Sequence, residues 1–207
     1  MLDAEGFILA GGASSRMGTD KARLRLGAQT FVERIAHALA SATRRVSVVS
    51  AKPDASEWGL PVVADIYAGA GALGGIHAAL SACAAEWAVL VSCDLPFVTG
   101  ELLTRLVAFG AAGVQEFDAV APLQTDGRPQ PLCTLYRRER CLARAGALLQ
   151  AGERRPRVLL REVRTRWVLP EELNDLSGAG LFFLNVNTPE DYARARALAA
   201  NEATEAG

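Results

Sequence analysis

The residues best suited to chemistry lie near the N-terminus, in the stretch "LAGGASSRMGTDK" from Leu9 to Lys21. Gly11 and Gly12 let backbone N–H groups approach a ligand without a Cβ in the way, and successive N–H groups of this kind bind anions. Serine hydroxyls add donors, while Arg16 and Lys21 add fixed positive charge. A connecting turn needs no cations, so this stretch predicts a binding site for a polyphosphate.

A second candidate is the acid within "VLVSCDLPF", a hydrophobic run from Val89 to Phe97. Pro96 prevents further sheet pairing, so a strand should end close to Asp94. Ligands of open α/β sheets bind at the carboxyl ends of strands, where Asp94 would share a crevice with the glycine loop. A carboxylate there can hold Mg²⁺, which bridges phosphate oxygens. A capping role is the alternative, but Thr99 and Glu101 are equally good caps for the next helix.

These candidates need a sheet to position them, and the hydrophobic pattern predicts one. Continuous valine, isoleucine and leucine runs alternate with helical patterns, which indicates a mostly parallel twisted sheet with helices on both faces. The fold class is therefore a three-layer, Rossmann-like α/β fold. Strands are predicted at 6–10, 45–50, 60–65, 87–93, 118–121, 130–138 and 181–186. Helices are predicted at 31–40, 73–85, 101–109 and 139–150, with a last one opening at Thr188.

Length and composition exclude several classes of protein. With 207 residues, 50% of them hydrophobic, the chain suits one domain over 1–200 and a frayed tail over 201–207. A net charge of -1 gives no electrostatic basis for binding nucleic acid or an acidic membrane. No apolar run reaches the ~18 residues of a membrane helix. The four cysteines form no C-x-x-C pair, so a reduced cytoplasmic protein is expected.

The stretch from Leu9 to Lys21 resembles the signature L-A-G-G-x-S-x-R-M-G-x-D-K of the molybdenum cofactor guanylyltransferases (MobA-type), which are members of the nucleotidyltransferase superfamily. Other motifs follow in the order of that family. "CDLPF" resembles C-D-x-P-[FY], and "FLNVNTPEDY" resembles N-[VI]-N-T-P-E-[DE]-[LY]. "GALGGI" resembles G-P-L-A-G-[IM], with Ala72 in place of the proline and Gly74 in place of the alanine. The resemblance covers nearly the whole chain.

The resemblance implies both a fold and a reaction. The fold is that of nucleotide-diphospho-sugar transferases. The reaction transfers GMP from GTP to the phosphate of Mo-molybdopterin, which gives the guanine dinucleotide cofactor and pyrophosphate, with Mg²⁺ as the metal. The implied partners are GTP and molybdopterin, together with transient contacts to other molybdenum-cofactor synthesis proteins and target apoenzymes.

The resemblance also implies roles for individual residues. Arg16, Lys21 and Asp94 would be catalytic, and Asp94 would hold the metal. Ser50 stands where the best-known family members carry a nucleotide-contacting asparagine, and Asp65 matches a nucleotide-contacting aspartate. The implied substrate contacts are Leu9, Ala10, Gly11, Gly12, Ser14, Lys21, Ser50, Asp65, Asp94, Asn185 and Asn187, the two asparagines facing the second substrate or the metal.

Alternatives to this function stay open. Relatives that use CTP or UTP typically show L-A-A-G, so Gly12 favours guanine, while a molybdopterin cytidylyltransferase or a sugar-1-phosphate nucleotidyltransferase is the first alternative. A non-catalytic cofactor carrier is a further one, although it could lose Asp94 and Lys21, which are both present.

Several weaker motifs have a structural explanation as well as a functional one. Close helix packing explains "GALGGI" equally well, and Asp65 could be a turn acid. The basic stretches "YRRER" and "GERRPR" are either solvated helix faces or a binding surface for an anionic acceptor. His37 and His77 are expected on helix surfaces.

Overall fold

The computed structural model describes residues 2–10, 21–51, 58–65, 67, 69–113 and 115–205. Its strands are β1 (Ala4–Leu9), β2 (Arg25–Leu26), β3 (Gln29–Thr30), β4 (Val46–Ser50), β5 (Val62–Ala64), β6 (Trp87–Ser92), β7 (Ala119–Pro122), β8 (Cys133–Arg137) and β9 (Thr165–Val168). Its α-helices are α1 (Phe31–Ala40), α2 (Gly71–Ala82), α3 (Gly100–Ala112), α4 (Arg138–Gln150), α5 (Pro156–Glu162) and α6 (Pro189–Glu205). Two 3₁₀ turns, η2 (Lys21–Arg23) and η4 (Pro170–Glu172), complete the described elements.

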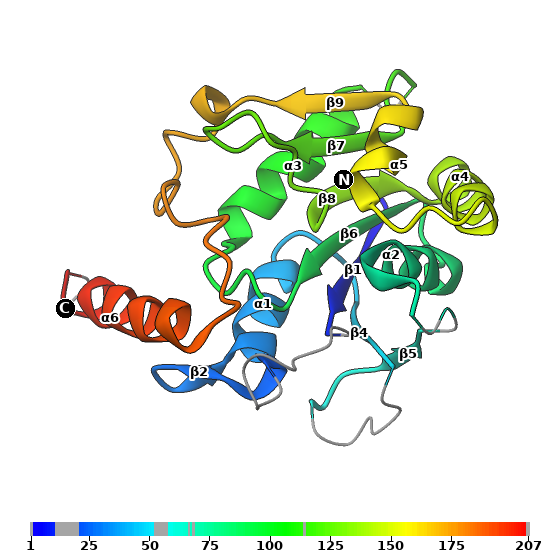
Figure 1. Cartoon of the computed structure of the whole chain (residues 1–207). Coiled ribbons are helices and arrows are strands. Elements are labelled where there is room, and N and C mark those ends of the chain that lie inside the picture. The colour runs from blue at the N-terminus through cyan, green and yellow to red at the C-terminus, as the bar shows by residue number, and fades with distance from the viewer. Residues whose placement is uncertain are drawn as a thin grey trace.

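A single large sheet forms the centre of the molecule (Figure 1). Within the described residues it has seven strands in the order β5-β4-β1-β6-β8-β7-β9. β1 runs parallel to both of its neighbours, β4 and β6, and β8 is antiparallel to β6 and β7. The mostly parallel sheet predicted from the apolar runs is therefore confirmed, with β8 as its antiparallel member.

Helices cover both faces of the sheet, as the sequence predicts (Figure 1). Alternate side chains of β1 enter two different cores because successive residues of a strand point to opposite faces. Ile8 packs with α1 and α3, whereas Phe7 and Leu9 pack with α2 and α4. α1 and α3 approach closely at Gly100, where an added Cβ would lie 2.6 Å from the Ser41 hydroxyl oxygen.

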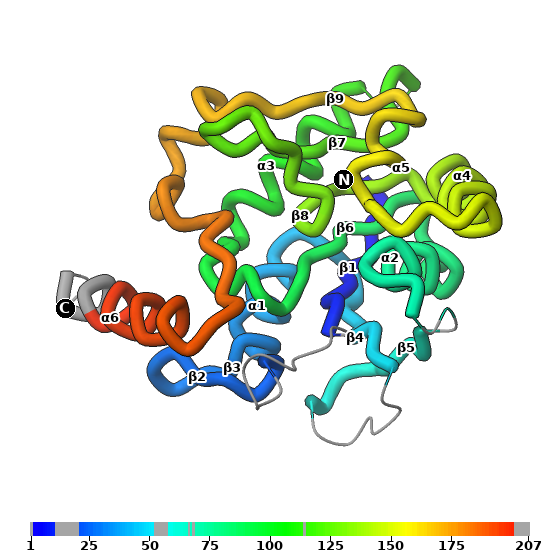
Figure 2. Tube along the Cα trace, in the orientation of Figure 1, coloured from blue at the N-terminus to red at the C-terminus, as the bar shows by residue number. Residues whose placement is uncertain are grey.

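A third, smaller core joins the C-terminal helix to the N-terminal half of the chain. α6 lies beside the short β2–β3 hairpin, at the side of the sheet where β1 and β6 end (Figure 2). The buried members of this core are Leu26, Phe31, Phe97, Val186 and Ala195. Three segments that are distant in sequence, 26–31, the one around Phe97 and 186–195, thus meet at one place.

Most of the predicted elements are present. The helix expected at 31–40 is α1 itself, and Thr30 and Glu33 cap its N-terminus reciprocally. The strand predicted at 181–186 is wrong: this run forms turns, with Phe182 buried in the α1–α3 core and Val186 in the α6 core. The apolar residues there anchor two clusters instead of pairing in a sheet. α6 extends to Glu205, into the tail expected to fray.

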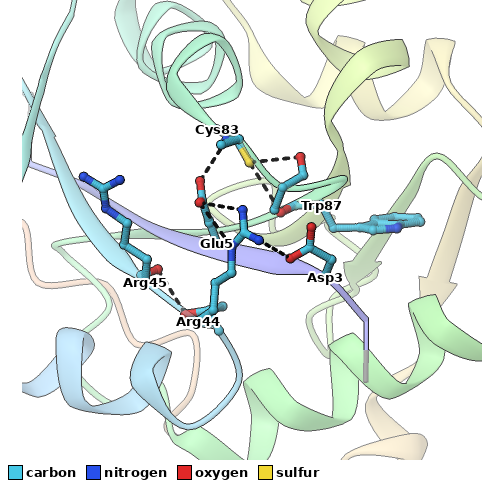
Figure 3. Close-up of polar contacts among 9 residues, drawn as sticks. Asp3, Glu5, Arg44, Arg45, Cys83 and Trp87 are labelled. Atoms are coloured by element: carbon cyan, nitrogen blue, oxygen red, sulfur yellow. Dashed lines mark hydrogen bonds and ion pairs between the residues drawn. The ribbon is translucent and has the colours of Figure 1, made fainter.

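At the end of the sheet opposite the predicted site, a buried glutamate in β1 links several segments of the chain (Figure 3). Glu5 is 6% exposed, and its carboxylate accepts hydrogen bonds from the Ala84 N–H at 2.9 Å and from Arg44 Nη2 at 3.0 Å. Arg44 also pairs with Asp3 at 2.9 Å. Burial alone would raise the pKa of Glu5, but the bonds from Ala84 and Arg44 outweigh it and lower that pKa. This cluster joins β1 to the loops after α1 and α2.

The cysteines behave as small apolar residues. All four are buried thiols. Burial raises the pKa of Cys83 to about 11 and the pKa values of Cys133 and Cys141 to about 12. Such thiols stay protonated and unreactive at neutral pH. Among the described residues, no helix has the length and apolar character needed to cross a bilayer.

Candidate functional site

The predicted site residues start from neighbouring strands that end at the same edge of the sheet. β4, β1 and β6 lie side by side and parallel. Beyond their last residues, the Ala10 N–H donates to the Val49 carbonyl at 2.9 Å, and the Cys93 N–H donates to the Leu9 carbonyl at 3.1 Å. Leu9 and Ala10 are thereby held next to the segment that carries Asp94. Gly11, Gly12, Ser14 and Arg16 lie outside the described residues.

Asp94 is half-buried at this edge, and one of its carboxylate oxygens is fully buried. Among the described residues, nothing hydrogen-bonds to its Oδ1 atom, which is buried. Thr99 caps α3 by accepting from the Leu102 N–H at 3.3 Å, so Asp94 is not used as a cap. A buried polar atom without a partner costs about 1–3 kcal/mol and calls for an explanation. A bound cation would supply the missing partner, so this oxygen fits the metal-ligand role.

A single strand-end carboxylate such as Asp94 is compatible with one kind of metal site in particular. No group of three or more histidine, cysteine, aspartate or glutamate side chains in the described part of the chain could form a complete cage. Mg²⁺ typically takes only one or two carboxylates from a protein and completes its shell with water and substrate phosphates. Asp94 therefore suits Mg²⁺ that arrives with a polyphosphate.

The Lys21 side chain contacts the C-terminal motif "FLNVNTPEDY" (Phe183–Tyr192). Its ammonium Nζ donates to Asn187 Oδ1 at 2.6 Å, although the two residues are 166 positions apart. The preceding residue, Val186, donates its backbone N–H to the Asp94 carbonyl at 2.9 Å. Two of the predicted catalytic residues are thus held by consecutive residues of one segment. The amide nitrogen of Asn185, the other asparagine of this motif, donates to the Phe183 carbonyl at 3.3 Å.

The C-terminal motif is held rigidly by its own helix start. Thr188 Oγ1 accepts from the Asp191 N–H at 3.1 Å, while Asp191 Oδ2 accepts from the N–H groups of Asn187 and Thr188 at 3.0 and 2.9 Å. The backbone hydrogen bond from Asn187 lowers the pKa of Asp191, and Lys21 adds to this effect. Thr188 thus caps the helix that was predicted to begin there, and Asp191 fixes the backbone of Asn187.

Ser50 and Asp65 also come together, at the ends of β4 and β5. The Asp65 N–H donates to the Ser50 carbonyl at 3.1 Å, and Asp65 Oδ1 accepts from the Tyr67 N–H at the same distance. His77 stacks edge-on against Tyr67, with ring centroids 4.8 Å apart, and is half-buried where an exposed surface residue was predicted. Burial lowers the pKa of His77, and nearby Asp65 opposes that shift. Ser50 and Asp65, the two predicted nucleotide contacts, therefore lie together at the carboxyl ends of β4 and β5.

The "GALGGI" motif opens α2 next to this edge. Gly71 has a φ of +62°, a conformation that favours glycine. A Cβ added to Gly74 would lie 2.8 Å from Ala70 Cβ and 3.2 Å from Tyr67 Cβ. Close packing thus accounts for Gly74, and a direct role of the motif with nucleotide stays a prediction.

The basic turn of "GERRPR" lies beside the start of α2. A Cβ on Gly71 would be 3.9 Å from the Arg154 carbonyl oxygen. The Glu153 carboxylate accepts from Arg155 Nε at 2.9 Å and Nη2 at 2.7 Å, and these contacts lower its pKa to about 2. Part of the positive charge of this turn is therefore neutralised locally.

Comparisons with known proteins show the family to which the chain belongs. A family model described as the MobA-like NTP transferase domain matches residues 6–167. A probable molybdenum cofactor guanylyltransferase of Pelotomaculum thermopropionicum is 35% identical over 205 residues, which cover 99% of this chain and 97% of that protein.

Solved structures show the same fold. Molybdopterin-guanine dinucleotide biosynthesis protein A of Archaeoglobus fulgidus has a TM-score of 0.81 at 25% identity, over 95% of this chain and 99% of its own. The 2-C-methyl-D-erythritol 4-phosphate cytidylyltransferase of Thermus thermophilus has a TM-score of 0.70 at 18% identity, over 96% of this chain and 100% of its own. The predicted nucleotidyltransferase-type fold is thus confirmed.

Proposed function

The chain belongs to the family of MobA-like NTP transferases, and from this premise we propose that it transfers GMP from GTP to the phosphate of Mo-molybdopterin, with release of pyrophosphate. The observation that carries the proposal is that two consecutive residues contact both candidates: Asn187 accepts from the Lys21 ammonium, and Val186 donates to the Asp94 main-chain carbonyl. A cation near a strand-end carboxylate whose Oδ1 atom has no partner in the described part of the chain suits a metal-bound triphosphate.

The proposed reaction is a single displacement at phosphorus. An oxygen of the acceptor phosphate attacks the α-phosphorus of GTP, a new P–O bond forms, and the bond to the β-phosphate oxygen breaks as pyrophosphate leaves. Catalysis of such a step rests on positioning and on stabilisation of the charge that develops on the leaving group. No covalent intermediate on the protein is required, and the cysteines are buried thiols with raised pKa values.

Each site residue has a proposed part in this step. Lys21 stabilises negative charge on the phosphates, and Arg16 is expected to do the same from the glycine loop. Asp94 would hold Mg²⁺, which when bound would neutralise phosphate charge and orient the triphosphate. Ser50 and Asp65, joined at 3.1 Å through their backbones, would contact the nucleoside.

The acceptor side of the site is proposed on sequence grounds. Molybdopterin would approach past the C-terminal motif, where Asn185 and Asn187 are the expected contacts. Transient contacts with other proteins of cofactor synthesis and a cytoplasmic location complete the proposal.

Nucleotide-dependent thermal shifts test the proposed substrate. GTP with Mg²⁺ should raise the melting temperature more than CTP, UTP or ATP at equal concentration, because a ligand at 100 times its Kd stabilises a protein by about 2.7 kcal/mol. An equal or larger shift with CTP would move the assignment to a cytidylyltransferase. No shift with any nucleotide would favour the non-catalytic carrier.

A further inference from the structure

The C-terminal segment from Val186 to Tyr192 holds two catalytic candidates at once. We propose that this segment is a clasp that sets the position of the Lys21 ammonium relative to Asp94, with Asn187 and Tyr192 acting as positioning residues. The inference rests on the proposed function for its catalytic readout, and the contacts that carry it are independent of any substrate.

The first half of the clasp fixes Asp94. The Val186 N–H donates to the Asp94 carbonyl at 2.9 Å. Val186 is fully buried in the same small core as Phe97, three residues beyond Asp94. A buried apolar anchor and a backbone hydrogen bond therefore hold the segment against the end of β6.

The second half fixes the side chain of Lys21. Asn187 Oδ1 accepts from Lys21 Nζ at 2.6 Å, and the Asn187 backbone N–H is itself held by Asp191 at 3.0 Å. The Asp191 carboxylate adds a favourable charge interaction with Lys21. Because Val186 and Asn187 are consecutive, one peptide unit links the Asp94 main chain to the partner of the Lys21 ammonium.

Tyr192 fixes the main chain that follows Lys21. Its hydroxyl donates to the Arg25 carbonyl at 2.9 Å and accepts from the Arg25 N–H at 3.4 Å. Its ring packs edge-on against Phe31, with centroids 6.1 Å apart. η2 continues directly into this hairpin, since the Leu24 N–H donates to the Lys21 carbonyl at 3.1 Å. The segment from Val186 to Tyr192 therefore contacts the Lys21 side chain through Asn187 and, through Tyr192, the main chain at Arg25 that follows Lys21.

This arrangement has a functional consequence because phosphoryl transfer depends on position. A catalytic group misplaced by about 1 Å can cost on the order of 100-fold in rate. Removal of a clasp contact should therefore lower kcat, because the Lys21 ammonium would no longer be held in its position. The resemblance to known guanylyltransferases instead suggests that Asn187 contacts the second substrate or the metal, and that role would not depend on Lys21.

A double-mutant cycle separates the two roles, because residues that act through one another show non-additive effects. Turnover would be measured at saturating GTP and acceptor for wild type, Lys21→Ala, Asn187→Ala and the double variant. We expect Asn187→Ala to lower kcat about tenfold in the wild-type background and to change it less than twofold when Lys21 is already alanine. Equal losses in both backgrounds, or a change confined to the KM of the acceptor, would overturn the clasp.

Tyr192→Phe tests the other end of the clasp, because it removes the bond to Arg25 and keeps the ring against Phe31. Tyr136→Phe is the matched control: that buried tyrosine donates to the Pro131 carbonyl at 2.8 Å, outside the clasp. Turnover should fall several-fold for Tyr192→Phe and stay within twofold for Tyr136→Phe. Equal losses in the two variants would show a general effect on the fold and overturn the role of Tyr192.

Hydrogen exchange gives a readout that needs no activity. Peptides that cover residues 21–30 should exchange faster in Asn187→Ala and in Tyr192→Phe than in wild type, and unchanged exchange in both would refute the clasp. If the wild-type protein fails to transfer GMP but the two variants exchange faster than wild type, the proposed function fails and the clasp stands.

Discussion

Replacing Asp94 by asparagine tests the chemistry proposed for the end of β6. Asparagine keeps the shape of the side chain and one neutral oxygen but removes the charge. The buried Oδ1 atom of Asp94 has no partner among the described residues, so the substitution removes no hydrogen bond of that atom within them. We therefore expect the melting temperature of Asp94→Asn to stay close to that of wild type or to rise slightly.

The expected loss of activity follows from the charge that is removed. A unit charge pair at ~4 Å contributes about 4 kcal/mol at an effective dielectric constant of ~20. A hundredfold loss corresponds to about 2.7 kcal/mol, well within that figure. Transfer by Asp94→Asn should fall by about two orders of magnitude or more, and additional Mg²⁺ or Mn²⁺ should restore part of it.

Pyrophosphate release across a metal titration provides the assay. Wild type and Asp94→Asn would be compared at equal nucleotide and acceptor concentrations, with melting curves recorded on the same samples. Full activity of the variant at low Mg²⁺ would refute the metal role. Loss of folding would show instead that Asp94 is a structural acid.

Three further changes test other parts of the molecule. Lys21→Ala should leave the fold intact and cost on the order of 2–4 kcal/mol of transition-state stabilisation, and unchanged kcat/KM would show a solvated loop residue. The lowered pKa of Glu5 adds stability above its unfolded pKa that is lost as pH falls through the folded pKa. Urea unfolding should therefore show Glu5→Gln less stable by about 1–3 kcal/mol at pH 7, with a smaller loss on acidification than wild type; parallel pH profiles would contradict the role of the Arg44 pair. Gly100→Ala should destabilise by about 1–3 kcal/mol, because the new Cβ would lie 2.6 Å from the Ser41 hydroxyl oxygen, and Ser41→Gly should recover most of that loss; an unchanged melting temperature would argue against the close α1–α3 contact.

The elements that local pattern determines could be predicted well. α1 begins and ends where its apolar period does, and β6 is a continuous buried run that pairs on both sides. The run 181–186 looks like such a strand, but its residues form turn hydrogen bonds, as between the Leu184 N–H and the Leu181 carbonyl at 3.0 Å. Its apolar character comes from anchoring two cores, which a periodic pattern does not distinguish from strand pairing.

The sequence predicts which residues form the candidate site better than it predicts the contacts between them. The types of Lys21 and Asp94, and their places after two apolar runs, are enough to indicate phosphate and metal chemistry. The contact of Lys21 with Asn187 spans 166 positions and depends on how α6 packs, so no local pattern reveals it. The signal that was available is the pair of asparagines before Thr188, which helix capping alone leaves unexplained.

Transfer of the α-phosphate label from GTP to a pterin product is the decisive measurement for the proposed function. The protein would be incubated with Mg²⁺, Mo-molybdopterin and GTP or CTP labelled at the α-phosphate. We predict that label from GTP enters the pterin product with one pyrophosphate released per transfer, and that CTP reacts far more slowly. No labelled pterin from GTP, or transfer from CTP at an equal or greater rate, would contradict the proposed guanylyltransferase activity.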